Sequence, residues 1–102
     1  MYKEQMPEEV LDRIQKKENI VILDVREHDE WESGHIPGAK HIPLGQIARA
    51  LNEMDMRQET VVVCRSGNRS GQACDFLSSM GYNVLNMPGG MSKWTGEIAY
   101  GK

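Results

Sequence analysis

Two short apolar runs most constrain what this chain can fold into. They are IVILD at residues 20–24 and ETVVVC at residues 59–64, and a polar stretch follows each of them. An apolar run without polar alternation is typical of a strand that is covered on both faces. The segments around these runs have helical spacing, so strands alternate with helices along the chain. This order predicts an α/β fold, with a mostly parallel sheet flanked by helices on both faces.

Other segments fit the same architecture. Helical spacing or helix-end residues mark residues 7–18, 27–33, 44–54 and 69–81. Two further strands are expected at residues 39–42 and 82–87. In the helix predicted at 44–54, Ile47, Ala48 and Leu51 share the apolar face. In the helix predicted at 69–81, Met80 is expected to face the core and Gly81 to end the helix.

Length and composition predict one domain over residues 1–102. Of the 102 residues, 39% are hydrophobic and 26% are charged, which is enough for one core. The net charge is −3 and the Lys and Arg residues are scattered, so no nucleic-acid partner is expected. No apolar run approaches the length of a membrane span, and the first residues contain no apolar signal region. We therefore expect a cytoplasmic protein without a membrane partner, whose cysteines are reduced.

The stretch VVVCRSGNRS, residues 61–70, carries the strongest chemical signal. It places Cys64 at the end of a buried strand, in a loop that opens into a helix. Gly67 allows the loop to curl so that backbone N–H groups face inward, and Arg65 and Arg69 add positive charge. Such surroundings lower the pKa of a cysteine from its ordinary value of about 8.5. The pattern predicts that Cys64 is largely a thiolate at neutral pH and attracts an anionic substrate.

Three stretches, in this order, carry a family resemblance: ILDVREHDEWESGHIPGAKHIPL, VVVCRSGNRS and LSSMGYNVLNMPGGMSKW. Over about residues 6–96 the chain resembles the single-domain rhodanese (thiosulfate sulfurtransferase) family. The resemblance implies a doubly wound fold around a five-stranded sheet, with Cys64 as the catalytic residue that carries sulfur as a persulfide. It also implies a substrate-binding loop that consists of Arg65, Ser66, Gly67, Asn68 and Arg69.

The resemblance implies a reaction in two halves. The Cys64 thiolate attacks the outer sulfur of thiosulfate and releases sulfite, and cyanide or a thiol then takes the sulfur. Neither a cofactor nor a metal is expected, and the sequence has no Cys and His cluster of metal-ligand spacing. The expected partners are a small-molecule sulfur donor and acceptor, and a protein donor or acceptor is a further candidate.

Two alternative functions stay open. The chain is a candidate carrier module that receives persulfide sulfur from a partner protein, for which thiosulfate is only a test-tube donor. It is also a candidate arsenate reductase or phosphatase, since those enzymes occur on similar folds. They resemble a pattern of Cys, five residues and Arg, whereas four residues separate Cys64 from Arg69 here. The shorter loop argues against a tetrahedral oxyanion substrate.

Several other residues are candidates for a role. Asp24 and Arg26 follow the first apolar run, and the resemblance implies that they are supporting residues tied by ion pairing, as is Glu30. His35 in GHIPG is a candidate base, but the family resemblance implies a structural turn there. Cys74 is expected to be an inert, half-buried thiol rather than a redox partner of Cys64.

The last motif contains two adjacent glycines and a tryptophan. Gly89 and Gly90 follow the last predicted strand and are expected to let that loop approach the cysteine pocket closely. Trp31 and Trp94 are expected to be packing residues rather than the walls of a ligand cage.

Overall fold

The carboxyl ends of all the strands meet at one edge, because the sheet is parallel throughout. The computed structural model describes residues 2–101, and within them the sheet has five strands in the order β1-β5-β4-β2-β3. The strands are β1 (Lys3–Glu4), β2 (Val21–Asp24), β3 (Lys40–His41), β4 (Thr60–Val63) and β5 (Val84–Asn86). The predicted α/β fold around a five-stranded sheet is confirmed.

The centre of the sheet is the pair formed by β2 and β4. Their register runs from Val21 opposite Thr60 to Asp24 opposite Val63, and every residue of β4 is buried. Side chains of a strand alternate between the two faces of the sheet. Val62 and Cys64 accordingly belong to one core cluster and Val63 to the other. The alternation therefore fixes the face to which Cys64 points.

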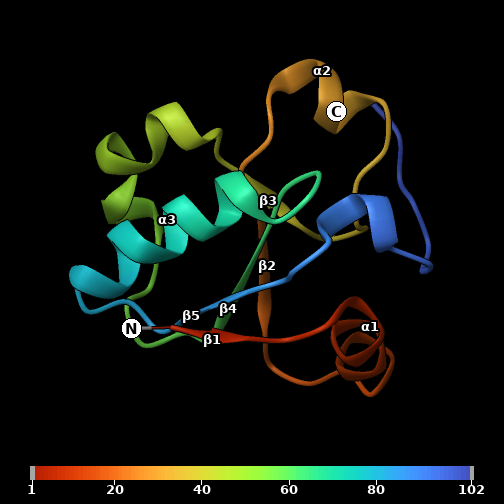
Figure 1. Ribbon diagram of the computed structural model, residues 1–102, viewed down its shortest axis with the longest axis horizontal. Coiled ribbons are helices and arrows are strands. Elements are labelled where there is room, and N and C mark those ends of the chain that lie inside the picture. Colours follow the sequence, from red (N-terminus) through yellow and green to blue (C-terminus); the bar gives the residue numbers. More distant parts are fainter. Residues whose placement is uncertain (1, 102) are drawn as a thin grey trace.

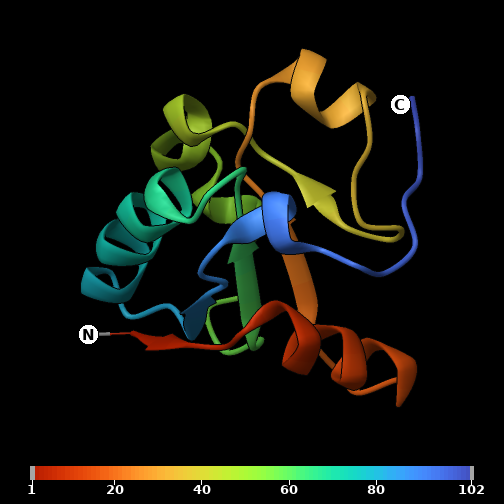
Figure 2. The same cartoon turned by 45° about the vertical axis from the view of Figure 1, so that its right-hand side comes forward.

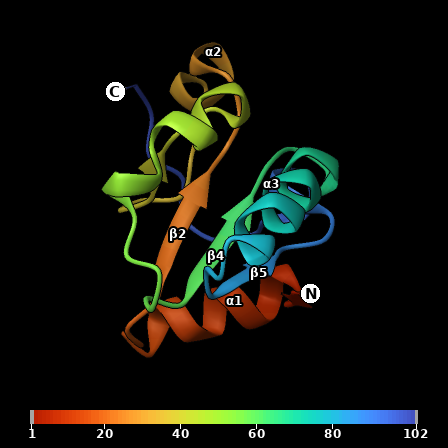
Figure 3. The same cartoon turned by 90° about the vertical axis from the view of Figure 1, so that its left-hand side faces the viewer.

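Helices cover the two faces. On one face lie α3 (Asn68–Ser79) and two short 3₁₀-helices, η1 (Leu44–Arg49) and η2 (Leu51–Glu53). On the other lies α1 (Pro7–Gln15), where Val10 is fully buried. Figure 1 shows α3 crossing in front of the strands, and Figure 3 shows α1 at the bottom of the view, away from α3. The remaining helices are α2 (His28–Glu32) and the 3₁₀-helix η3 (Gly90–Lys93).

Two details of the helices differ from the prediction. The segment at residues 44–54 is two 3₁₀-helices instead of one α-helix, and the 3₁₀ period of three buries Ile47 and Ala50 on one side. Ala48, which was expected on the apolar face, is exposed. Met80 is also exposed, at 47%, because α3 ends at Ser79 and the chain turns away there.

The loops at the carboxyl edge of the sheet bring distant segments together. Figure 2 shows the arrow of β4 pointing toward the loop that enters α3, with η3 beside that loop. The C-terminal segment runs beside the chain that leaves α2, and Ala99 forms an antiparallel bridge there with His35. No helix within residues 2–101 is long and apolar enough to cross a membrane.

Candidate active site

Cys64 directly follows β4 and is only 1% exposed. The chain leaves the strand at this residue and enters α3 three residues later, through Gly67 at the N-cap. Gly67 has a φ of +104°, and a Cβ built there would lie 3.2 Å from the backbone nitrogen of Gly89. Only glycine adopts this conformation at low cost, so the tight loop requires it.

The loop and the first turn of α3 both contact the Cys64 sulfur. The backbone N–H of Gly67 donates a hydrogen bond to Sγ at 3.0 Å, and Oγ of Ser70 lies 3.3 Å from Sγ. Ser70 stands in the first turn of α3 and is fully buried. The positive end of the α3 dipole is therefore directed at the sulfur, in a setting that favours a thiolate.

Opposing effects set the pKa of Cys64. Burial of the sulfur raises the pKa, because a thiolate loses hydration in the interior. Hydrogen bonding from the Ser70 hydroxyl lowers it, as do the backbone N–H groups of Ser70, Gly67 and Ser66. Hydrogen bonding prevails, so the pKa of Cys64 lies below its ordinary value.

The segment after β5 is hydrogen-bonded to the backbone of the loop that contains Cys64. The N–H of Met91 donates to the carbonyl of Cys64 at 2.8 Å, and the N–H of Ser92 donates to the carbonyl of Arg65 at 2.9 Å. A Cβ built on Gly90 would overlap the Cys64 carbonyl oxygen and lie 2.7 Å from that of Arg65. The expected close approach of this glycine loop is confirmed, and it fixes the backbone that carries the thiol.

The two arginines of the loop are not equivalent. Arg69 donates to both carboxylate oxygens of Glu30, at 2.6 and 2.8 Å. This pairing with Glu30 is the main reason that the pKa of Arg69 is raised, and the nearby Cys64 contributes less. The hydrogen bonds of Arg69 therefore go to α2 and tie α2 to the start of α3, while its charge also lies near enough to favour the Cys64 thiolate.

Arg65 is exposed at the mouth of the loop. It lines an open depression of about 430 Å³ whose other walls come from α2, its flanking residues and η3. The lining residues are Arg26, Glu30, Ser33, Arg65, Met91 and Ser92. Ser66 and Asn68, the other predicted loop residues, are also exposed. The loop thus presents its backbone to the sulfur and its side chains to solvent.

Asp24 and Arg26 pair with each other instead of facing the sulfur. The Asp24 carboxylate accepts hydrogen bonds from the backbone N–H, Nε and Nη2 of Arg26, and Nη2 also donates to the carbonyl of Gly34 at 2.7 Å. Both side chains are buried. Breaking a buried pair on one side costs about 3–5 kcal/mol. The pair therefore holds the turn after β2, beside the depression that Arg26 helps to line.

His35 lies in a stack of aromatic rings. Its ring lies 3.5 Å from that of Trp31, nearly parallel to it, and its Nδ1 donates to the Trp31 carbonyl at 2.7 Å. His41 stacks near Trp31 at 4.7 Å, and its Nε2 donates to the carbonyl of Arg26. Among residues 2–101, no hydrogen bond joins a histidine to the Cys64 sulfur. The stack is a structural use of these rings.

Cys74 is fully buried in α3. Burial, with smaller effects of Asp75 and Cys64, raises the pKa of Cys74 to about 12. A thiol with this pKa stays protonated and unreactive at neutral pH. Both cysteines are free thiols.

A family model described as the Rhodanese-like domain matches residues 6–97. The chain belongs to the rhodanese-like family. It is 41% identical over 86 residues to "Putative sulfur carrier protein YrkF" of Bacillus subtilis, covering 83% of this chain and 46% of that protein. It therefore spans about half the length of that relative. Over 89 residues it is 35% identical to the thiosulfate sulfurtransferase GlpE of Pseudomonas putida, covering 86% of this chain and 80% of GlpE.

Solved structures agree with this assignment. The rhodanese-like domain protein of Staphylococcus aureus superposes with a TM-score of 0.92 at 30% identity, over 98% of this chain and 99% of that one. A larger cavity of about 620 Å³ exists in this rhodanese-like fold, but it lies between α1 and the segment around Trp94. Cys64 is not among its lining residues, so it is separate from the candidate site.

Two residues of the candidate site were missed from the sequence. Ser70 lies next to the predicted loop and Asn86 ends the last strand, and both are buried. A polar asparagine inside the apolar strand YNVLNM is a signal that a buried polar partner exists. The sequence alone does not reveal that the partner is Ser70, because strand order determines this contact.

Proposed function

We propose that this rhodanese-like chain transfers sulfane sulfur from thiosulfate, or another donor, to a thiophilic acceptor such as cyanide or a thiol, through a persulfide on Cys64. The observation that carries the proposal is the convergence of the Gly67 N–H and the N-terminus of α3 on one buried sulfur. Such a nest of N–H groups stabilises an anionic sulfur.

The reaction has two covalent steps. In the first, the Cys64 thiolate attacks the outer sulfur of thiosulfate, and the sulfur–sulfur bond of the donor breaks. Sulfite leaves with the electron pair, and Cys64 carries a persulfide anion that the loop N–H groups solvate. In the second, cyanide attacks the terminal sulfur, thiocyanate leaves, and the Cys64 thiolate is restored. Neither step uses a general base, because the attacking species is the thiolate form of Cys64, which the loop N–H groups stabilise.

Arg65 is proposed to bind the donor. Its guanidinium is exposed beside the depression at the loop mouth. An arginine there offers paired donors to the oxygens of the sulfonate group of thiosulfate. The charge of Arg69 is engaged by Glu30, so its proposed role in the loop is to hold the start of α3 in place.

A carrier function is the second candidate. The relative YrkF bears the name of a sulfur carrier, and the thiol chemistry of a carrier is the same. The donor would then be a protein persulfide, and the acceptor a partner protein. An arsenate reductase or phosphatase activity is less well supported, because the loop from Cys64 to Arg69 is one residue shorter than the pattern of those enzymes.

Steady-state kinetics test the proposal. With thiosulfate and cyanide both varied, an enzyme that passes through a persulfide gives parallel double-reciprocal lines. An enzyme saturates with thiosulfate at moderate concentration, whereas a carrier shows only a weak thiosulfate response and fast transfer from a persulfidated protein. Intersecting lines would contradict the two-step scheme.

A further inference from the structure

Asn86 contacts Ser70 and Gly67, which both lie against the Cys64 sulfur. It ends β5 and is 5% exposed. Val84 shares a core cluster with Cys64, and Leu85 belongs to the other cluster, so the alternation of the strand turns Asn86 toward Cys64. Its Oδ1 lies 2.5 Å from Oγ of Ser70, and its Nδ2 donates to the carbonyl of Gly67 at 3.3 Å.

The chemistry of the neighbours fixes the orientation of this amide. The carbonyl of Gly67 only accepts hydrogen bonds, so the amide nitrogen of Asn86 faces it and Oδ1 faces Ser70. Oδ1 cannot donate, so at 2.5 Å the proton between the two oxygens belongs to the Ser70 hydroxyl. A serine hydroxyl has one proton. While the Ser70 hydroxyl donates to Asn86, a lone pair of the Ser70 oxygen faces the Cys64 sulfur at 3.3 Å.

We propose that Asn86 is a positioning residue that decides, through Ser70, whether a proton or a lone pair faces the Cys64 sulfur. When Cys64 is a neutral thiol, the lone pair of the Ser70 oxygen accepts a hydrogen bond from its S–H. When Cys64 ionises, the hydroxyl turns from Asn86 to donate to the thiolate. Asn86 therefore competes with the Cys64 thiolate for the single hydrogen bond that the Ser70 hydroxyl donates, and this competition disfavours ionisation of Cys64.

The same rotation fits both halves of sulfur transfer, and in this respect the proposal rests on the function proposed above. Cys64 is a thiolate when it attacks the donor and again when it leaves from the persulfide. In both states the Ser70 proton is needed at Sγ. In the persulfide that forms between these two states, Sγ is a neutral sulfur bonded to the transferred sulfur, and the Ser70 hydroxyl again donates to Asn86. No proton is exchanged with solvent in this cycle.

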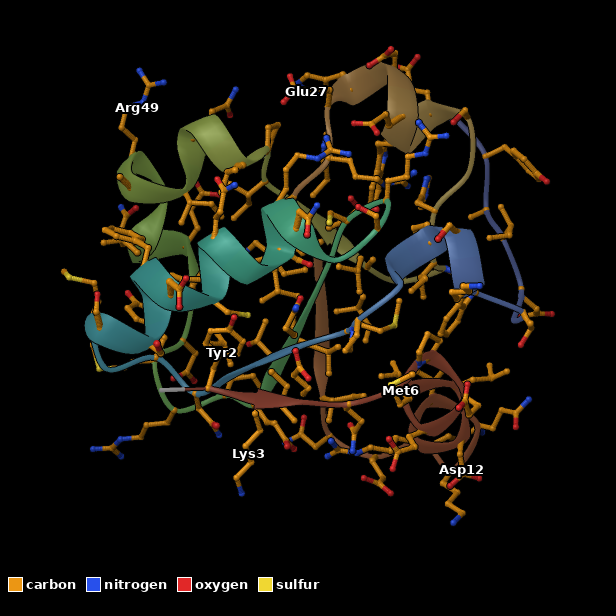
Figure 4. The ribbon with its side chains drawn as sticks, viewed as in Figure 1. Tyr2, Lys3, Met6, Asp12, Glu27 and Arg49 are labelled. Carbon is orange, nitrogen blue, oxygen red and sulfur yellow. The ribbon has the colours of Figure 1, made fainter. Side chains whose placement is uncertain are left out.

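Other titratable groups near the sulfur have their own partners or stay neutral. Arg69 is paired with Glu30, and the buried thiol of Cys74 has its pKa raised to about 12. The Tyr2 hydroxyl packs against Gly71, beside the Asn86 amide, and Figure 4 marks Tyr2 by the N-terminal strand below α3. Burial raises the pKa of Tyr2, so this ring is neutral at the pH of the experiment.

The test is the pKa of Cys64 in Asn86→Leu, which keeps the branched shape of the side chain but removes both the acceptor and the amide donor. Cys74→Ala is the background, and the rate of iodoacetamide alkylation is followed against pH. With Ser70 free to donate to sulfur, the pKa of Cys64 should fall by about 1. A merely structural Asn86 predicts the opposite sign, because a loosened loop loses the Gly67 N–H and the pKa rises. An unchanged or raised pKa would overturn the proposal.

The control removes Ser70. In a Ser70→Ala background, Asn86→Leu should move the pKa of Cys64 far less, and an equal shift with and without Ser70 would contradict the proposed route. Should Asn86→Leu fail to fold, Asn86→Asp keeps the shape and the acceptor. It should raise the pKa, more with Ser70 present than without it. Alkylation needs no sulfur transfer, so a chain that takes up no sulfur refutes the proposed function and leaves this test intact.

Discussion

Arg69, in the first turn of α3, donates hydrogen bonds to both carboxylate oxygens of Glu30 in α2, from Nη1 to Oε1 at 2.6 Å and from Nη2 to Oε2 at 2.8 Å. The backbone N–H of Glu27, at the start of α2 (Figure 4), donates to the same carboxylate. The pair joins the two helices that flank the candidate site. It is therefore expected to stabilise the fold, and its contribution should depend on pH.

Glu30→Gln should lose stability only where the carboxylate of the wild-type chain is charged. Arg69, against the opposing effect of burial and with the help of the Glu27 N–H, lowers the pKa of Glu30 from 4.5 to about 2. A pKa that folding depresses gives stability that is present above the unfolded pKa and lost as the pH falls through the folded one. The difference in unfolding free energy should be about 1 kcal/mol at neutral pH, since the pair is partly solvated.

Urea unfolding of the wild-type and Glu30→Gln chains between neutral pH and pH 2 measures this difference in unfolding free energy. The difference should shrink as the pH falls from about 4.5 to about 2. A difference that does not change with pH would show that Gln alters packing and that the ion pair contributes nothing.

Cys64 should react as a thiolate at lower pH than an ordinary cysteine. Burial raises its pKa, but the hydrogen bonds from Ser70, Gly67 and Ser66 lower it by more. Alkylation of the Cys74→Ala chain should therefore reach half its maximal rate below about pH 8.5, the ordinary value. The Cys64→Ser chain, which retains only the buried Cys74, is the control and should react slowly. A rate that climbs until pH 8.5 or beyond would mean that the loop does not activate the resting thiol.

Gly90→Ala should destabilise the loop that carries Cys64. Gly90 has a φ of +53°, and a Cβ there would overlap the backbone of Cys64 and Arg65. We expect a loss of about 3 kcal/mol in unfolding free energy, because the obstacle is backbone that cannot move aside. Gly45→Ala is the matched control, since a Cβ at Gly45 meets no atom within 4 Å. Similar stabilities of the two variants would show that the close approach is not required.

Arg65→Ala should weaken donor binding more than chemistry. Its charge lies at the mouth of the loop, so the KM for thiosulfate should rise roughly tenfold, which corresponds to about 1.4 kcal/mol, while kcat changes less. Arg49→Ala is the control, because Arg49 points away from the fold at η1 (Figure 4). An unchanged KM would assign Arg65 some other role.

The sequence predicted the parts of the molecule that depend on local pattern. Apolar runs identified β2 and β4, and the strand–loop–helix order placed Cys64 and Gly67 where the structure has them. It missed β1, because Lys3–Glu4 is a two-residue, exposed edge strand that joins the sheet only through pairing with β5.

Contacts between distant segments were harder to predict. The positions of two arginines near Cys64 are plain from the sequence, but the pairing of Arg69 with Glu30, thirty-nine positions away, is not. The link from Asn86 to Ser70 depends on β5 lying next to β4. Neither partner can be read from spacing along the chain, because strand order and the placement of α2 determine them.

The most direct test of sulfur transfer through Cys64 is the intact mass of the chain after incubation with thiosulfate. We predict a gain of one sulfur atom, mapped to the peptide that contains Cys64 and removed by cyanide with release of one equivalent of thiocyanate. The Cys74→Ala chain should gain the sulfur equally, and the Cys64→Ser chain should gain none. A wild-type chain that gains no mass from thiosulfate or from a persulfidated protein, or a Cys64→Ser chain that still gains it, would contradict the account.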